Sequence, residues 1–208
     1  VREHINLPIA ERTWITAFGE VAGEPTEFDY SNATQGVLSV GYAKHATNCG
    51  PEYPFGISFE RLVDGPVLIV KCAWGGTSVH VPWRPPSLSN AETPIEKATR
   101  EAANKAAAEE AKKGGFKFTP KPPQTGTGKV WERAMAHIQK VLADPGKYHP
   151  DYDPNAGYEL AGLVWFQGWN DKGNEEYGDQ LVSFIKDVRE ELKAPELPVV
   201  CGLLGHSS

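Results

Sequence analysis

The sequence predicts an α/β fold of three layers, α/β/α, in which a mainly parallel sheet lies between helices. Three apolar runs, typical of strands that are buried on both faces, occur at residues 66–72, 159–166 and 198–204. Amphipathic stretches of helical length separate these runs, and Gly- and Pro-rich breakers stand between the segments. The alternation of strand and helix indicates parallel strands joined by crossover helices.

Length, composition and charge fit a globular domain. The 208 residues are enough for one domain with a substantial core. A hydrophobic content of 40% and a charged content of 23% are ordinary for a soluble protein. The net charge of −6 argues against a general nucleic-acid or anionic-membrane binder. No apolar run reaches transmembrane length. We therefore expect neither a nucleic-acid nor a membrane partner, while the oligomeric state stays open.

The first third of the chain contains three predicted strands and one predicted helix. Residues 13–18 alternate between apolar and polar and predict a short strand. Residues 36–42 predict a second strand, and residues 53–62 are amphipathic and predict a short helix. The buried run at residues 66–72 then provides the first strand without alternation.

The middle of the chain differs in composition and predicts an insertion. Residues 94–113 are rich in Ala, Lys and Glu, with Glu and Lys at helical spacing, which predicts a solvated helix. Residues 114–129 contain many Gly and Pro residues and predict a linker. We interpret 87–128 as an insertion within a single domain that spans residues 1–208. The GTGK at its end follows no strand, so it does not indicate a nucleotide site.

Two amphipathic helices are expected in the last third of the chain. Residues 130–143 carry apolar side chains on one face, and His137 within them is expected to be partly exposed. Residues 175–193 predict a longer helix, which Pro195 ends.

Polar segments follow three of the predicted strands at the points where these strands end. Gly75-Gly76 follows the first buried run, residues 167–171 follow the second, and Gly205-His206 follows the third. The carboxyl ends of parallel strands share one edge of a sheet, where ligands bind in open α/β folds. We therefore expect these three segments to converge.

The converging residues suit acyl-transfer chemistry, which builds negative charge on a carbonyl oxygen. Such a reaction needs N–H donors directed at that oxygen and an activated nucleophile. The backbone N–H groups of Gly75 or Gly76, together with the side-chain amide of Gln167 or Asn170, can be these donors. Asp171 can order the loop or orient a base.

Two ordered motifs resemble those of a known family. The chain reads VLIVKCAWGGTS at residues 67–78 and GLVWFQGWND at residues 162–171. This pair resembles the SGNH-type hydrolases, particularly the branch that holds sialate O-acetylesterases and family 6 carbohydrate (acetylxylan) esterases. That branch typically shows a strand leading to A-x-GGT and another leading to W-x-QGE. The resemblance covers roughly residues 36–86 and 130–205.

The resemblance implies a three-layer, flavodoxin-like fold and removal of acetyl groups from sugar esters by a Ser–His–Asp set. The implied partner is an acetylated carbohydrate or similar small ester, and the family favours a secreted or periplasmic location.

By motif match, two donors of an oxyanion hole are implied. The Gly75-Gly76 turn resembles the block that gives a backbone donor, and Gln167 matches the glutamine of the QGE block. Where the branch usually has Glu, this chain continues with WND. The letters GWND also spell the superfamily's wider G-x-N-D block, in which the Asn is the donor. Gln167 and Asn170 therefore compete for one role, and we favour Gln167.

The family's nucleophile and base blocks do not occur in this sequence. No G-Q-S-N block lies near the start, and no D-x-x-H block follows Val200. The chain starts at Val1 and ends just past a predicted strand, so we expect a fragment of a longer domain. The alternative is a non-catalytic carbohydrate-binding or structural module with this fold. We interpret Ser78 as a cap or loop hydroxyl, not as a substitute nucleophile.

No cofactor and no metal are expected. The three cysteines have no spacing typical of a metal site, and Cys72 and Cys201 lie in apolar runs where we expect them to be buried. His80 has no carboxylate or Cys partner at metal spacing in the sequence, so we interpret it as a surface histidine or as one whose hydrogen bonds are satisfied within the fold.

Overall fold

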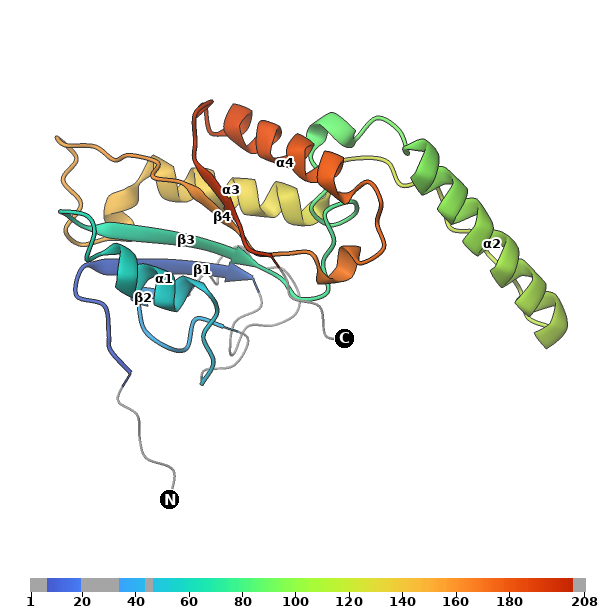
Figure 1. Cartoon of the computed structure of the whole chain (residues 1–208), viewed down its shortest axis with the longest axis horizontal. Coiled ribbons are helices and arrows are strands. Elements are labelled where there is room, and N and C mark those ends of the chain that lie inside the picture. Colours follow the sequence, from blue (N-terminus) through green and yellow to red (C-terminus); the bar gives the residue numbers. More distant parts are fainter. Residues whose placement is uncertain (1–6, 20–33, 44–46, 204–208) are drawn as a thin grey trace, which may run out of the picture. The chain divides into compact units, whose positions relative to one another are not determined.

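The computed structural model of the chain describes residues 7–19, 34–43 and 47–203 (Figure 1). Strands and helices are mixed along these residues, so the α/β class is confirmed. Within the described ranges, no helix combines the length and the apolar character needed to cross a bilayer.

The chain folds into two compact units. The first consists of Val1–Gly76 and Arg133–Gly162, and the second consists of Thr77–Glu132 and Leu163–Ser208. Each unit contains its own sheet.

The first unit is built on a three-stranded sheet with β1 in the middle. β1 (Thr13–Gly19) pairs in parallel with β3 (Val67–Ala73) and antiparallel with β2 (Thr34–Val37). Figure 1 shows β1 and β3 side by side. The strands predicted at 13–18 and 66–72 are confirmed. The strand predicted at 36–42 is observed as β2 at Thr34–Val37, so only residues 36 and 37 of the predicted strand lie in the sheet. The chain leaves the sheet after Val37 and then turns at Gly41, whose φ is 117°.

The core of this unit lies between the sheet and α1 (Glu52–Phe59). Ile15 and Leu38 are fully buried and pack with Tyr53 of the helix. A Cβ atom on Gly56 would lie 2.2 Å from the Leu38 Cδ2 atom, so glycine lets the helix lie close to the core.

His137 belongs to this core, and the prediction that it is partly exposed is wrong. It lies in α3 (Lys129–Ala143) and is 3% exposed. Its ring stacks on Phe18 at a centroid distance of 4.9 Å, and its Nε2 lies 3.2 Å from the Thr16 Oγ1. Burial, assisted by the charge of Lys140, lowers the pKa of His137 to about 4.

A loss of stability in weak acid follows from the buried His137. Its pKa is lower in the folded protein than in the unfolded chain, where an ordinary histidine has about 6.5. The unfolded state therefore binds more protons between these two values, and the stability contributed above pH 6.5 is lost as the pH falls toward 4. Urea unfolding measured across this window should show a smaller pH dependence for His137→Gln than for the wild type. Equal dependence in the two proteins would contradict the assignment.

The second unit contains a two-stranded parallel sheet and an aromatic core. β4 (Leu163–Trp165) pairs with β5 (Val199–Cys201), and α4 (Tyr177–Glu191) packs against the pair. The Phe184 ring of α4 is buried and lies 4.3 Å from Trp165 between ring centroids. Trp83 and Trp131 also contact Phe184 edge-on, at 6.1 and 5.1 Å.

The sheet of the second unit is covered less than the sequence predicts. Trp165 is buried, whereas Val164, Val200 and Cys201 are exposed. The predictions that these runs are buried on both faces and that Cys201 is buried are therefore wrong. Cys72 is partly buried, and all three cysteines are free thiols.

The helix predicted at 94–113 is α2 (Pro94–Gly114), and it is as solvated as predicted. Among its residues only Ala111 is buried. Thr93 and Glu96 form a capping box at its start, and Gly115 ends it with φ 68°. In Figure 1 the helix extends away from α4, and the following segment returns alongside it.

Three short 3₁₀ helices complete the described elements: Pro86–Leu88, Pro145–Lys147 and Trp169–Asp171.

Candidate functional site

The Asp171 carboxylate is the centre of a hydrogen-bonded cluster in the second unit. Its Oδ2 accepts hydrogen bonds from the Val79 backbone N–H at 2.9 Å and from the Gln167 Nε2 at 2.6 Å. Its Oδ1 lies 3.1 Å from the His80 Nδ1 and accepts from the Asn174 Nδ2 at 3.3 Å. The cluster thus joins the segment after the Gly-Gly turn to the segment after β4.

The electrostatics of the cluster favour an ionised Asp171. Burial alone raises the pKa of this carboxyl, but the hydrogen bonds from His80, Val79, Gln167 and Asn174 outweigh burial and hold the pKa below its ordinary value. An ionised carboxylate only accepts hydrogen bonds, so the His80 Nδ1 must carry the proton that faces it. When the ring is neutral, the lone pair is therefore on the His80 Nε2 atom.

The two partners differ in their exposure to solvent. The Asp171 side chain is 1% exposed, whereas the His80 side chain is 34% exposed. Within the part of the chain that the structure describes, the His80 Nε2 makes no hydrogen bond. The buried Asp171 carboxylate thus orients the His80 ring, and the Nε2 atom of that ring is available to a ligand.

Arg84 fixes the backbone of His80 from the other side. Its side chain is fully buried, and its Nη1 donates to the His80 carbonyl at 3.0 Å. The same guanidinium forms two hydrogen bonds with the Glu96 carboxylate of α2, at 2.6 and 3.2 Å. Its remaining donors reach the carbonyls of Leu88 and Ala91, so all of its N–H groups are used.

A closed ring of hydrogen bonds connects these groups. Asn174, which donates to Asp171, also donates to the Gln180 Oε1 at 2.8 Å. The Gln180 Nε2 donates in turn to the Glu96 Oε1 at 3.2 Å. Because Glu96 binds Arg84, the ring returns to His80. The start of α2 therefore supports the site, and α2 is more than a solvated excursion.

The Gln167 amide is committed within the protein. Its Nε2 donates to the Thr77 carbonyl at 2.9 Å and to Asp171, which uses both of its hydrogens. Its Oε1 is buried and has no partner among the described residues. The exposed Asn170 side chain makes no hydrogen bond within the described ranges. In this geometry Gln167 holds the loop together, and the Asn170 amide is available to a ligand.

The structure brings together some of the predicted site residues. Gln167 and Asp171 are in direct contact, as expected from the strand end. Gly75 and Gly76 end the first unit, so their pairing with Gln167 in one oxyanion hole stays a prediction. Gly205-His206 lies outside the described residues.

His80 is the residue of the cluster that the sequence did not reveal; of the two interpretations left open, the structure shows a hydrogen-bonded histidine that is partly exposed. Its partner Asp171 lies 91 positions away. A signal was present, because His80 follows the Gly75-Gly76 turn by only four residues. The sheet-edge argument applied to that turn extends to it.

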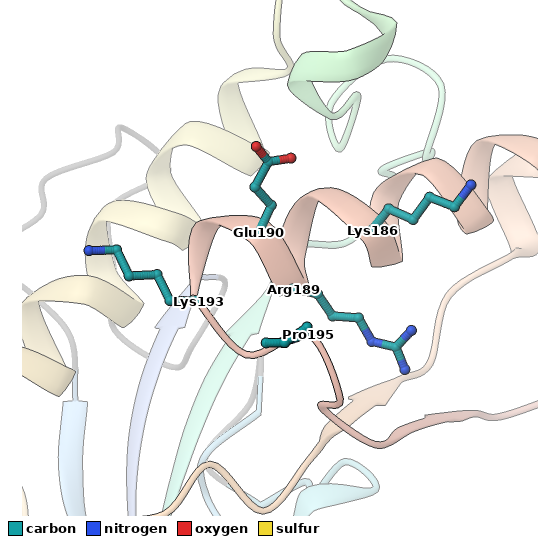
Figure 2. A pocket seen from close by; sticks show the side chains of 5 residues that line it. All are labelled: Lys186, Arg189, Glu190, Lys193 and Pro195. Atoms are coloured by element: carbon teal, nitrogen blue, oxygen red, sulfur yellow. The ribbon is translucent and has the colours of Figure 1, made fainter.

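A charged hollow on α4 lies apart from this cluster in the sequence (Figure 2). Its four charged side chains point in different directions and do not converge on one point. Arg189 is also used to bind the Leu197 carbonyl, at 3.1 and 2.8 Å. This hollow therefore lacks a built site. It is lined by Lys186, Arg189, Glu190, Lys193 and Pro195.

Comparisons with known proteins agree with the site's motifs. The model of a family described as "Carbohydrate esterase, sialic acid-specific acetylesterase" matches residues 10–208. No curated protein matches the chain. The X-ray structure of a protein from Arabidopsis thaliana is similar, with a TM-score of 0.52 and 15% identity. The match covers 95% of this chain and 60% of the Arabidopsis chain, and at this identity it shows a shared fold alone.

Proposed function

Because the chain belongs to the carbohydrate esterase family of sialic acid-specific acetylesterases, we propose that it removes acetyl groups from sugar esters. The observation that carries the proposal is the cluster around Asp171, which holds His80 and Gln167 at the end of β4. The proposal includes the three-layer α/β/α arrangement, for which the parallel pairs β1–β3 and β4–β5 are supporting evidence.

The proposed reaction uses a serine nucleophile that lies outside the motifs of this sequence. The serine attacks the acetyl carbonyl, and the oxyanion is bound by a backbone N–H of Gly75 or Gly76 together with a side-chain amide. By resemblance, Gln167 provides this side-chain amide. To do so, it gives up its hydrogen bond to the Thr77 carbonyl. Asn170 provides the amide without any such change.

An exposed aromatic side chain supports a sugar ester as substrate. Trp169 directly precedes Asn170, and 66% of its surface is accessible. An indole face of this kind can stack on the apolar face of a sugar ring.

Two single-residue variants, measured side by side, distinguish Gln167 from Asn170 as the side-chain oxyanion donor. Turnover of p-nitrophenyl acetate is measured for Gln167→Ala and Asn170→Ala in the full-length protein. Removal of the true oxyanion donor should lower kcat about a hundredfold with little change in KM. The variant of the other residue should stay near the wild type in kcat, after correction for any loss of folded protein.

Two results would contradict the proposal. If neither variant lowers kcat, no side-chain amide completes the oxyanion hole. If the full-length wild type binds acetylated sugars without hydrolysing any acetyl ester, the chain belongs to a non-catalytic carbohydrate-binding module.

A further inference from the structure

We propose that the tip of the α2 arm is a binding surface for an acidic polysaccharide. The arm consists of α2 and the segment that returns alongside it, residues 94–129, and its tip is residues 112–121 (Figure 1). The choice of a carbohydrate as the anionic partner rests on the proposed function, whereas the charge and the construction of the arm do not depend on it.

The charge of the arm is opposite to that of the rest of the chain. Beyond Glu96, residues 97–129 contain eight basic and three acidic residues, a net charge of +5 within a chain of net charge −6. No Asp or Glu occurs between Glu110 and Glu132, and all five lysines of that stretch are exposed. These are Lys112, Lys113, Lys117, Lys121 and Lys129. Because charges more than about 8 Å away are largely screened at physiological salt, the acidic body does not cancel the local field of the tip.

Most of the tip lysines have no acidic partner. Lys112 pairs with Glu109 at 2.9 Å on the exposed surface. Lys113, Lys117 and Lys121 form no ion pair with any residue that the structure describes. Their ammonium groups are therefore available to the carboxylates of a ligand.

An exposed aromatic ring lies among these lysines. The Phe116 side chain is 65% exposed, and its ring rests on Gly114, where a Cβ atom would collide with it. Gly115 between them has φ 68°, which turns the chain back at the end of α2. An apolar ring beside ammonium groups suits an acidic sugar polymer, which presents both C–H faces and carboxylates.

Hydrogen bonds fix the return segment to α2, although the sequence predicts only a linker there. The Asn104 Oδ1 accepts from the Lys121 backbone N–H at 2.9 Å, and the Asn104 Nδ2 donates to the Lys121 carbonyl at 3.0 Å. Nearer the start of the arm, Glu92 binds the Arg100 Nε at 2.8 Å and the Gln124 backbone N–H at 2.9 Å. The tip is thus a preformed surface, which lowers the entropic cost of binding.

A linear polymer fits the arm better than a bilayer does. Ile95 is the one large apolar residue in the sequence of α2, so the helix has no apolar face to lie in a membrane. A helix of 21 residues is roughly 32 Å long, at 1.5 Å per residue. A polysaccharide can span that length and reach the start of α2, where Glu96 joins the hydrogen-bonded ring around Asp171. Binding at the tip then raises the local concentration of acetylated units near the cluster.

The test compares polymer binding by two double variants of the full-length protein. Lys113→Gln with Lys117→Gln removes two charges from the tip. Lys186→Gln with Lys193→Gln removes the same charge from the hollow near the end of α4 and is the matched control. The Kd for polygalacturonate, measured by calorimetry, should rise about tenfold in the tip variant with a weaker dependence on salt, and should stay at the wild-type value in the control. Neutral dextran should not bind.

Several results would overturn the binding surface. These are no binding of polygalacturonate by the wild type, an equal Kd for the tip variant and the wild type, and tighter binding of a DNA oligonucleotide or of phosphatidylserine vesicles.

Hydrolysis separates this inference from the proposed function. On p-nitrophenyl acetate, which is too small to reach the tip from the cluster, the tip variant should keep the wild-type kcat. On acetylated polygalacturonate its KM should rise about tenfold. A wild type that binds the polymer but hydrolyses neither ester contradicts the proposed function and leaves the binding surface standing. A wild type that hydrolyses both esters with the same KM as the tip variant contradicts the binding surface alone.

Discussion

Asp171→Asn is expected to lower the turnover of the proposed acetyl-ester hydrolysis about a hundredfold, as loss of one oxyanion donor does, because the carboxylate holds the loop that carries the Gln167 and Asn170 amides. The substitution keeps the size of the side chain but replaces one acceptor oxygen with an N–H₂ donor. A donor that faces the His80 Nδ1 favours the tautomer with its proton on Nε2. The hydrogen bonds on both sides of the loop therefore change.

The measurement pairs kcat with the ring tautomer in the same protein. Nitrogen-15 NMR should show that the His80 proton has moved from Nδ1 to Nε2 in Asp171→Asn. Asp179→Asn, an exposed carboxylate in the first turn of α4, is the matched control and should be neutral. A kcat for Asp171→Asn close to that of the wild type would contradict the prediction.

The helices and strands follow from local patterns, and this part of the fold could be predicted closely. The solvated helix is expected at 94–113 and observed at Pro94–Gly114, because the cap at Thr93 and the left-handed Gly115 are local signals. The burial of His137 could also be predicted locally. His137 lies three residues after Ala134 and four before Val141, both fully buried, so helical periodicity alone places it on the inner face.

The site could be predicted only in part, because it joins distant segments. Gln167 and Asp171 lie within one short stretch after a strand, and the pattern of that stretch indicates a site. The partnership of Asp171 with His80 depends on which loops meet. The place of His80 shortly after the Gly75-Gly76 turn indicates a loop near the sheet edge, but it does not indicate the partner. The wrong prediction that Cys201 is buried has another cause. An apolar run indicates a strand, but it does not indicate which residues cover that strand.

Arg84→Met is expected to lower the free energy of unfolding by about 3–5 kcal/mol, since it removes one partner of a buried ion pair. Arg84 is fully buried and Glu96 is 10% exposed, so the carboxylate would remain in the interior without its cation. The carbonyls of His80, Leu88 and Ala91 would lose their donor as well. Urea unfolding of the variant and the wild type measures the difference.

Lys112→Met is the matched control for this prediction. Lys112 pairs with Glu109 on the exposed surface of α2, where the two side chains are 73% and 55% exposed, and its loss should cost less than about 1 kcal/mol. Equal effects of the two substitutions would mean that burial adds nothing to the Arg84–Glu96 pair. Adding Glu96→Gln to Arg84→Met should recover part of the stability, because it removes the uncompensated charge.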